Sequence, residues 1–194
     1  MATFNILNTG SLTIGSGGET PEPVIDPSKT RFTVGGNVEE HSITGTLDRQ
    51  WMIDNGYFDS DEYEWIKYIT HVDIGNTVTI IGTSAFAAND SLTSVTIPNS
   101  VISIGDGAFG ASGMTSVTIP NSVTSIGNFA FQTCSSLTNV TIGDHVTSIG
   151  QQAFDGCFNL ETITVLGKTT AQAQTLLGNA EVPEECTIVG ELGD

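Results

Sequence analysis

The chain has 194 residues, enough for one ordinary domain or a domain with a small appendage. Lysine and arginine number 5 and aspartate and glutamate number 22, and the net charge of −17 disfavours nucleic acid and anionic membrane surfaces as partners. No apolar run reaches the roughly 18 residues of a membrane span, and Met1 to Asn5 lack the basic and apolar regions of a signal peptide. We therefore expect no nucleic-acid partner, no membrane insertion, no transmembrane segment and no signal peptide.

The first 30 residues combine a polar tail with a linker. Residues 1–18 are rich in Gly, Ser and Thr, and residues 19–30 contain three prolines, which is typical of an extended linker. A tail beyond such a linker is disordered unless a partner or the body of the protein holds it. We interpret residues 1–18 as an attachment peptide held by a protein partner. Its alternating apolar residues are the candidate attachment residues: Phe4, Ile6, Leu12 and Ile14.

Residues 31–68 are expected to form a small α/β N-terminal cap, because a solenoid needs a cover over its first apolar coil. Trp51 and Trp65 would supply large apolar groups to this cap. The expected elements are a β-hairpin of 31–34 and 39–44, a helix over 47–54, and a second helix capped by Asp59 or Ser60.

A tandem repeat occupies the middle of the chain. Each copy reads Val-x-x-Ile-Gly, then Ala-Phe three residues after the glycine, then an alternating strand pattern. The copies are spaced by 23, 22 and 23 residues, and the one-residue deletion lies between Phe109 and Met114, in a turn. The copies begin at Val78, Val101, Val123 and Val146, and the strand patterns cover 92–97, 114–119, 137–142 and 160–165.

Partial copies extend the array to six strands in one register. Ile69, Val72 and Ile74 open it, while Cys186 and Ile188, 23 residues after Ile163 and Val165, close it. A short helix is expected over 171–177, with Leu177 in the place of the next phenylalanine. The solenoid then spans 69–168, and 169–194 is a short helical C-terminal cap.

The alternation within one unit predicts how the coils pack. In 94–97, Val95 and Ile97 point inward and Ser94 and Thr96 outward, and the repeated glycine allows a turn into a short helical or 3₁₀ segment carrying Ala and Phe. No unit can bury its own core, so stacked coils complete it and align the phenylalanines. The fold class is therefore an α/β repeat solenoid.

The units 137–142, 146–150 and 152–157 resemble the BspA-like (Treponema-type) leucine-rich repeat family, and the resemblance covers about residues 69–166. It implies a right-handed solenoid with a role in adhesion or ligand binding at surfaces. It supplies no catalytic residues.

Motifs for chemistry are missing from the sequence. The acidic cluster at 59–64 lacks the glycine and distal glutamate of a calcium loop and is interpreted as an acidic helix start. His41, His71 and His145 are isolated, and neither a Gly-x-Ser-x-Gly elbow nor a phosphate-binding loop occurs. Lys and Arg are absent from 68–167. We expect a non-enzyme with no cofactor and no metal site.

The three cysteines do not form a disulfide framework. Cys134 and Cys157 lie one repeat apart, in a column with Asn89 and Ser112 that resembles the ladder position of leucine-rich repeats. A disulfide between adjacent coils is the alternative, but two free thiols are expected. Cys186 is expected to be buried in the column of Ile163.

The outward columns of the strands form an uncharged face. It is either only a solvated surface, or a site for glycans or a protein partner, or a regular array that orders water as ice-binding solenoids do. The candidate binding residues are Ser94, Thr96, Ser116, Thr118, Asn139, Thr141, Thr162 and Thr164.

These features together suggest a structural or adhesion module. The leading hypothesis is a virion (phage) accessory or decoration protein, attached through 1–18 to a capsid or tail protein and displaying its solenoid toward a host glycan or surface protein. The alternative is a bacterial cell-surface or secreted adhesin. Either way, the expected location is a virion or an extracellular surface.

Overall fold

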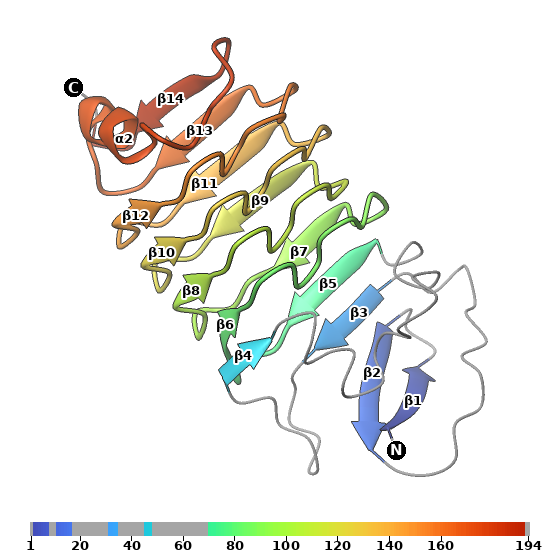
Figure 1. Ribbon diagram of the computed structural model, residues 1–194. Helices are drawn as coiled ribbons and strands as arrows, with labels where there is room; N and C mark the ends of the chain where they lie inside the picture. Colours follow the sequence, from blue (N-terminus) through green and yellow to red (C-terminus); the bar gives the residue numbers. More distant parts are fainter. Residues whose placement is uncertain (1, 8–10, 17–30, 35–44, 48–69, 193–194) are drawn as a thin grey trace.

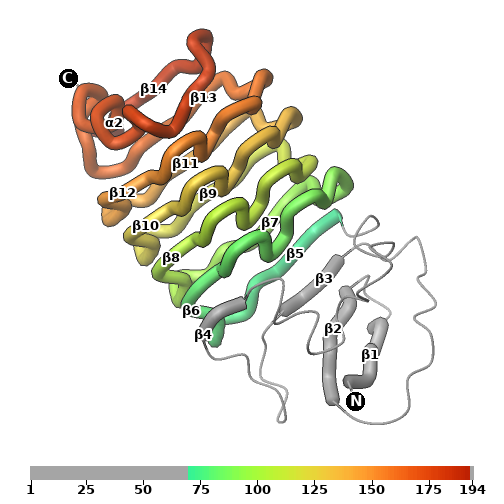
Figure 2. The backbone as a smooth tube through the Cα atoms, in the orientation of Figure 1, coloured from blue at the N-terminus to red at the C-terminus, as the bar shows by residue number. Residues whose placement is uncertain are grey.

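The computed structural model describes residues 2–7, 11–16, 31–34, 45–47 and 70–192, and its repeats stack as a solenoid (Figure 1). The tube in Figure 2 winds coil on coil toward the C-terminus. From β7 to β12, each coil contributes a longer strand on one side and a two-residue strand on the other. None of the described residues belongs to a helix long and apolar enough to cross a membrane.

The longer strands form one side, here called the long-strand side. Their spacing along the chain follows the sequence repeat, and all of them run parallel. They are β5 (His71–Ile74), β7 (Ser94–Thr96), β9 (Ser116–Ile119), β11 (Asn139–Ile142), β13 (Thr162–Val165) and β14 (Thr187–Gly190).

The opposite short-strand side is also parallel. It consists of β6 (Val78–Ile81), β8 (Ser103–Ile104), β10 (Ser125–Ile126) and β12 (Ser148–Ile149). The repeated isoleucine is in register from coil to coil, since Ile81, Ile104 and Ile126 lie opposite one another in turn. The expected solenoid and its common register are therefore confirmed here.

The core consists of the inward columns that the alternation predicts. Val117, Val140 and Ile163 are opposite one another and at most 3% exposed. The phenylalanine spine stacks its four rings with centroids 5.5 Å apart and interplanar angles of 12°, 9° and 6°. The members of this spine are Phe86, Phe109, Phe131 and Phe154.

The Ala-Phe segment is a turn and not the expected short helical or 3₁₀ segment. Its amides alternate between bonds within the turn, such as Ala108 N–H to Gly105 O at 3.3 Å, and bonds to the next coil, such as Phe109 N–H to Ala130 O at 2.8 Å. The residue before each alanine has a left-handed backbone, including Phe129 at φ 58°. This conformation ends helical winding. The amide of the left-handed residue and the amide of the phenylalanine both bond to the neighbouring coil, as in Gly107 N–H to Asn128 O and Phe109 N–H to Ala130 O.

Strands before residue 70 continue both sides by one coil. β3 (Arg31–Val34) pairs parallel with β5, and β4 (Gly45–Leu47) pairs parallel with β6. Beyond them, β2 (Ser11–Ser16) pairs parallel with β3 and antiparallel with β1 (Ala2–Leu7).

The expected hairpin of 31–34 with 39–44 is wrong, because β2 and β5 occupy both edges of β3. Leu47 ends β4 and does not begin a helix. The remaining expected cap elements, over 39–44 and 48–68 with Trp51 and Trp65, lie outside the described residues.

The last coil replaces its short strand with helix α2 (Thr170–Leu176), close to the expected 171–177. Thr169 caps it by a reciprocal pair of hydrogen bonds with Gln172. Leu177 is buried, as expected. The N–H of each phenylalanine bonds to the alanine carbonyl of the next coil, and the Phe154 N–H bonds to the Ala180 carbonyl, so Ala180 continues the alanine column.

The register of β14 differs from the expected one. Ile188, not Cys186, lies opposite Ile163, so the final step is two residues longer than the 23-residue repeat. The reason is the helix, which follows a different path from the short strand it replaces. Cys186 is consequently half-buried just before the strand and not in the inward column.

Candidate binding surface

The predicted outward residues project from the long-strand side in two rows. From β9 to β13 these rows are continuous, because Asn139 lies between Ser116 and Thr162, and Thr141 lies between Thr118 and Thr164. All six are exposed or half-exposed and uncharged. We call these six residues the hydroxyl face.

Ser94 and Thr96 are separated from that face. They lie on β7, opposite His71 and Asp73 of β5. No ladder joins β7 to β9, so the long-strand side is divided into two sheets at this point. The single uncharged lattice that the sequence suggests is therefore interrupted between the first and second of its four expected coils.

The interruption coincides with the one-residue deletion. In the coils of β7 and β11, the residue that begins the strand pattern (Leu92 or Leu137) donates its N–H to the ladder residue three positions earlier, at 3.1 Å. In the short coil, the Gly113 N–H instead bonds back to Asn89 O of the preceding coil, at 3.1 Å. A Cβ at Gly113 would lie 1.9 Å from Asp90 O, so only glycine allows this approach. The short turn thus redirects the chain before it enters β9.

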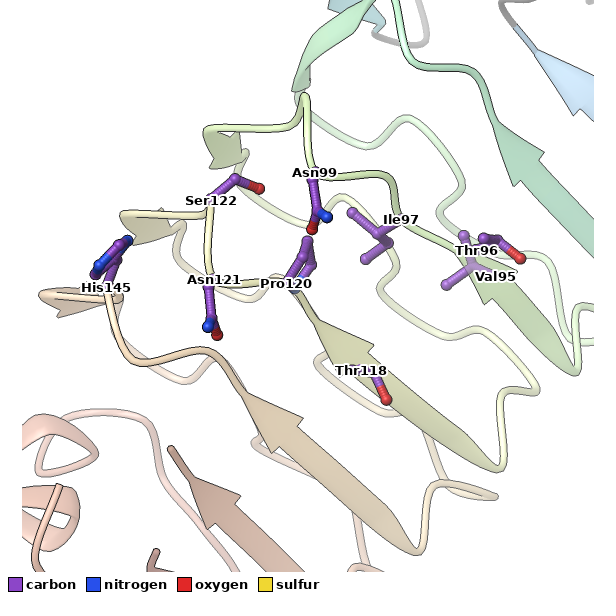
Figure 3. Close-up of a pocket in the computed structure, with 9 residues that line it drawn as sticks. All are labelled: Val95, Thr96, Ile97, Asn99, Thr118, Pro120, Asn121, Ser122 and His145. Carbon is purple, nitrogen blue, oxygen red and sulfur yellow. The ribbon is translucent and has the colours of Figure 1, made fainter. Parts of the chain in front are cut away.

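A groove of about 680 Å³ lies where the ladder is interrupted (Figure 3). Its walls come from β7 and the segment after it, from β9 and the segment after it, and from the loop that follows β11. The lining residues are Val95, Thr96, Ile97, Asn99, Thr118, Pro120, Asn121, Ser122 and His145.

The floor of the groove is the apolar core itself. Val95 is half-buried, whereas Val72 and Val117 at the equivalent positions are 1% and 3% exposed. Ile97 is 9% exposed, and its counterpart Ile119 is 1% exposed. In the other coils the next strand covers these aliphatic side chains, but at the interruption they contact solvent.

The lining of the groove carries no formal charge apart from a histidine that can be protonated. The Nε2 of His145 lies 3.8 Å from Oδ1 of Asp144, with the histidine side chain 70% exposed. Lys168 is the one lysine or arginine within 70–192, a span that contains ten carboxylates. The neutral groove and hydroxyl face thus stand out on an acidic protein.

The cysteine column has the structural role expected of it. Its four members are all buried: Asn89, Ser112, Cys134 and Cys157. Both ladder cysteines are free thiols, as is Cys186. The Cys134 thiol donates to Phe109 O at 3.2 Å and the Cys157 thiol to Phe131 O at 3.1 Å. These ladder cysteines therefore satisfy carbonyl groups inside the coils.

The two ladder thiols shift one another's pKa in opposite directions. A hydrogen bond with Cys157 lowers the pKa of Cys134 even though burial opposes ionisation, and the same hydrogen bond raises the pKa of Cys157. Burial also raises the pKa of Cys186. The ladder thiols are buried, so their role is internal packing and not nucleophilic chemistry.

The remaining candidates are placed as follows. Phe4 is opposite Ile14 and Ile6 is opposite Leu12 in the β1–β2 pair, so the four attachment candidates occupy paired positions. His71 Nδ1 is 2.8 Å from the hydroxyl of its neighbour Thr70. Within the described ranges no group of three or more His, Cys, Asp or Glu residues has the arrangement of a metal site. His41 and the acidic cluster at 59–64 lie outside those ranges.

The groove was not predicted from the sequence. Its one signal was the 22-residue spacing between Val101 and Val123, which we interpreted as a tolerated deletion in a turn. The inward columns continue through that coil, so hydrophobic alternation alone did not reveal the interruption.

Comparison with known proteins agrees with this architecture. The family model described as "BspA type Leucine rich repeat region (6 copies)" matches residues 57–182. A leucine-rich repeat protein of Bacteroides ovatus is 26% identical, with a TM-score of 0.55 over 64% of this chain and 30% of its own. The leucine-rich repeat protein of T. pallidum has the same fold, with a TM-score of 0.64, 16% identity, and coverage of 99% of this chain and 80% of its own.

The chain thus spans less than a third of the length of the Bacteroides protein. No curated protein matches it significantly. The family match extends over well over half of the chain. The chain therefore belongs to the BspA-type leucine-rich repeat family.

Proposed function

We propose that this protein is a non-enzymatic binding module that presents the hydroxyl face to a protein partner. The observation that carries the proposal is the continuous register of six uncharged hydroxyl and amide side chains on β9, β11 and β13. Repeat solenoids generally use such extended surfaces for binding. An uncharged face also avoids the electrostatic repulsion that the net charge of −17 imposes elsewhere.

A non-enzymatic role agrees with the chemistry of the described residues. Nucleophilic catalysis needs an accessible nucleophile beside a base. The ladder thiols are buried and bond to backbone carbonyls. His145 is exposed, and its Nε2 lies 3.8 Å from Oδ1 of the adjacent residue Asp144. It belongs to a different segment of the coil from those thiols.

The module acts at a surface, and we propose a virion as that surface, with attachment through residues 1–18 to a capsid or tail protein. The β1–β2 pair supports this assignment, because β1 is the outermost of the described strands of its sheet and an edge strand can pair with a strand of a partner. Deleting residues 1–28 should abolish incorporation into particles, while the circular dichroism spectrum of the solenoid persists. Normal incorporation of the truncated chain would contradict the attachment role.

A cell-surface or secreted adhesin is the second candidate, favoured by the exposed face alone, which needs no particle. Separating the source culture into particles, cell envelopes and medium, with immunodetection in each fraction, distinguishes the two. Ice binding is the weakest candidate, because the array of Thr-x-Thr rows is divided between β7 and β9. Thermal hysteresis of the purified protein tests it directly.

The binding face itself is tested by site-specific photo-crosslinking. A photoreactive amino acid replaces Thr141 at the centre of the hydroxyl face, and a matched control replaces Ser148, an exposed residue on the short-strand side. We expect a cross-linked protein partner from position 141 and none from position 148. Equal cross-linking from both positions, or cross-linking from 148 alone, refutes the assignment of the face.

A further inference from the structure

We propose that the groove between β7 and β9 is a binding site for a neutral oligosaccharide. This site goes beyond the proposed protein-binding function, and the only residue that it shares with the hydroxyl face is Thr118. Figure 3 shows the groove residues on β7 and β9, on the chain segments that follow these two strands and, for His145, on the loop after β11.

The groove is a feature of one coil and not of the repeat. Intact ladders join β5 to β7 and join β9, β11, β13 and β14, and the gap falls between β7 and β9, at the 22-residue step. In the same coil the Gly113 N–H bonds to Asn89 O, a contact that the lack of a side chain at Gly113 permits. The groove therefore coincides with a local change in the backbone of one coil.

The floor suits the C–H face of a sugar ring. Val95 is half-buried and Ile97 is 9% exposed at the groove, and Pro120 adds an aliphatic ring beside them. Small-molecule sites typically combine such an apolar lining with a few polar groups and have volumes of about 300–1,000 Å³. The observed 680 Å³ accommodates a short oligosaccharide.

The rim suits sugar hydroxyl groups, which both donate and accept hydrogen bonds. Asn121 Oδ1 accepts a bond from the Asp144 N–H at 3.3 Å. Asn99, Thr96 and Thr118 line the groove, and their side chains make no hydrogen bond to another described residue. Carboxamide and hydroxyl groups each offer donors and acceptors, so the rim matches a polyhydroxylated ligand in both directions.

The electrostatics select for a ligand without charge. No carboxylate, lysine or arginine lines the groove, so His145 is the only lining residue that could compensate a charged ligand. Acidic sugars are repelled by the net charge of −17. A basic peptide strand is the competing occupant, but the groove offers it no carboxylate to pair with.

The test uses the full ¹⁵N-labelled chain, followed by ¹H–¹⁵N chemical shifts. The probes are maltotriose, cellotriose, mannotriose and chitotriose, with sialyllactose as the acidic probe and an oligolysine peptide as the competitor. We expect at least one neutral trisaccharide, at millimolar concentration, to shift the amides of 95–99 and 118–122. Asn99→Ala and Thr118→Val should each weaken binding by about fivefold, as expected for one lost hydrogen bond.

Two further variants make the test specific. Ser148→Ala removes a hydroxyl from an exposed residue on the short-strand side, outside both the groove and the hydroxyl face, and should leave the affinity unchanged. Inserting one serine after Gly113 restores the 23-residue step and should abolish binding by closing the groove. If the insertion variant does not fold, Asn99→Ala and Thr118→Val decide the question.

Four outcomes overturn the proposal: no neutral trisaccharide shifts the groove amides, the shifts lie elsewhere, a folded insertion variant binds as well as the parent, or sialyllactose or oligolysine binds more tightly. The cross-linking result at Thr141 is independent of all four, so failure of the groove and failure of the hydroxyl face are distinguishable.

Discussion

Replacing Phe131 with alanine tests whether the stacked phenylalanines hold the coils together. Phe131 is fully buried at the centre of the described array and stacks on Phe109 and Phe154, both at 5.5 Å. The substitution removes both ring contacts and leaves a cavity between three coils. A solenoid has only neighbour-to-neighbour interfaces, so the damage cannot be shared with distant parts of the chain.

The size of the effect follows from these contacts. Truncating a buried phenylalanine to alanine costs about 3–5 kcal/mol, and each aromatic pair contributes about 0.5–1.5 kcal/mol beyond its buried area. With a ring on each side, Phe131→Ala belongs near the upper end, at about 4–5 kcal/mol. For a chain of this length, 1 kcal/mol corresponds to about 2–4 °C in Tm, so we expect a fall of about 8–20 °C.

The assay is urea unfolding followed by circular dichroism, with Tm measured in parallel. Phe158→Ala is the matched control, because the same atoms are removed from a side chain that is 83% exposed; its change should stay within about 0.5 kcal/mol. Phe131→Leu keeps most of the volume and should fall between the two. A loss below about 1 kcal/mol for Phe131→Ala, or a loss equal to that of Phe158→Ala, would refute a packed aromatic spine.

Three further predictions concern local features. Gly113→Ala should destabilise the protein by about 1–3 kcal/mol in urea unfolding, because the added Cβ meets Asp90 O at 1.9 Å; an unchanged midpoint would show that the turn relaxes freely. Thr169→Ala should cost about 1 kcal/mol in the same assay, since the cap of α2 is lost, whereas Thr169→Ser should retain stability. Iodoacetamide labelling followed by peptide mass spectrometry should find Cys186 modified first and the ladder cysteines protected. Because burial raises the pKa of Cys186, its labelling rate should increase as the pH rises above the usual thiol range. Preferential labelling of the ladder thiols at neutral pH would contradict the described burial.

The inward register was predictable because the same physical requirement recurs in every coil. A strand in a solenoid must bury alternate residues, so Val117, Val140 and Ile163 reveal their column by spacing alone. The ladder role of Cys134 was predictable for a similar reason, since a small side chain recurs beside a turn whose carbonyl needs a donor. Because the pattern is repeated, the assignment of each coil is supported by the other coils, which is not possible for a single strand.

The two ends were less predictable. Counting 23 residues from Ile163 gave Cys186, but helix α2 replaced a short strand and shifted the partner to Ile188. At the other end, Arg31–Val34 has the alternation of a hairpin strand, and the sequence contains no signal for its parallel pairing with β5. Partner choice in a sheet depends on which edges are available in three dimensions.

The outward residues on β9, β11 and β13 lie on the surface that the alternation predicted, but the groove beside them depended on a different property of the chain. Hydrophobic periodicity reports which side chains are buried, and Ile119 remains buried despite the deletion. A backbone ladder also requires repeated hydrogen bonds between neighbouring strands. Just before β7 and β9 the Thr115 N–H still bonds to Thr93 O at 3.3 Å, but no ladder continues along the two strands, although the inward column stays intact.

The coil that carries the groove stays attached to its neighbours through its two other seams. On the short-strand side Ile104 remains opposite Ile126, and in the core the rings of Phe109 and Phe131 stack at 9°. The missing ladder therefore weakens one of the three sets of contacts that join these two coils. Amide hydrogen exchange should report this difference, because local opening requires only the contacts of the affected seam.

We accordingly expect the amides of β9 to exchange faster than those of β11 and β13, whose preceding strands are paired with them. The amides of β8 and β10 serve as the control, since their ladder crosses the same pair of coils without interruption. If β9 and β11 were equally protected, the long-strand ladder would be closed in solution, and the groove could not present Val95 and Ile97 to a ligand. Faster exchange at β9 together with protected β10 amides would instead confine the opening to one side, as expected of a binding groove held on an otherwise continuous scaffold.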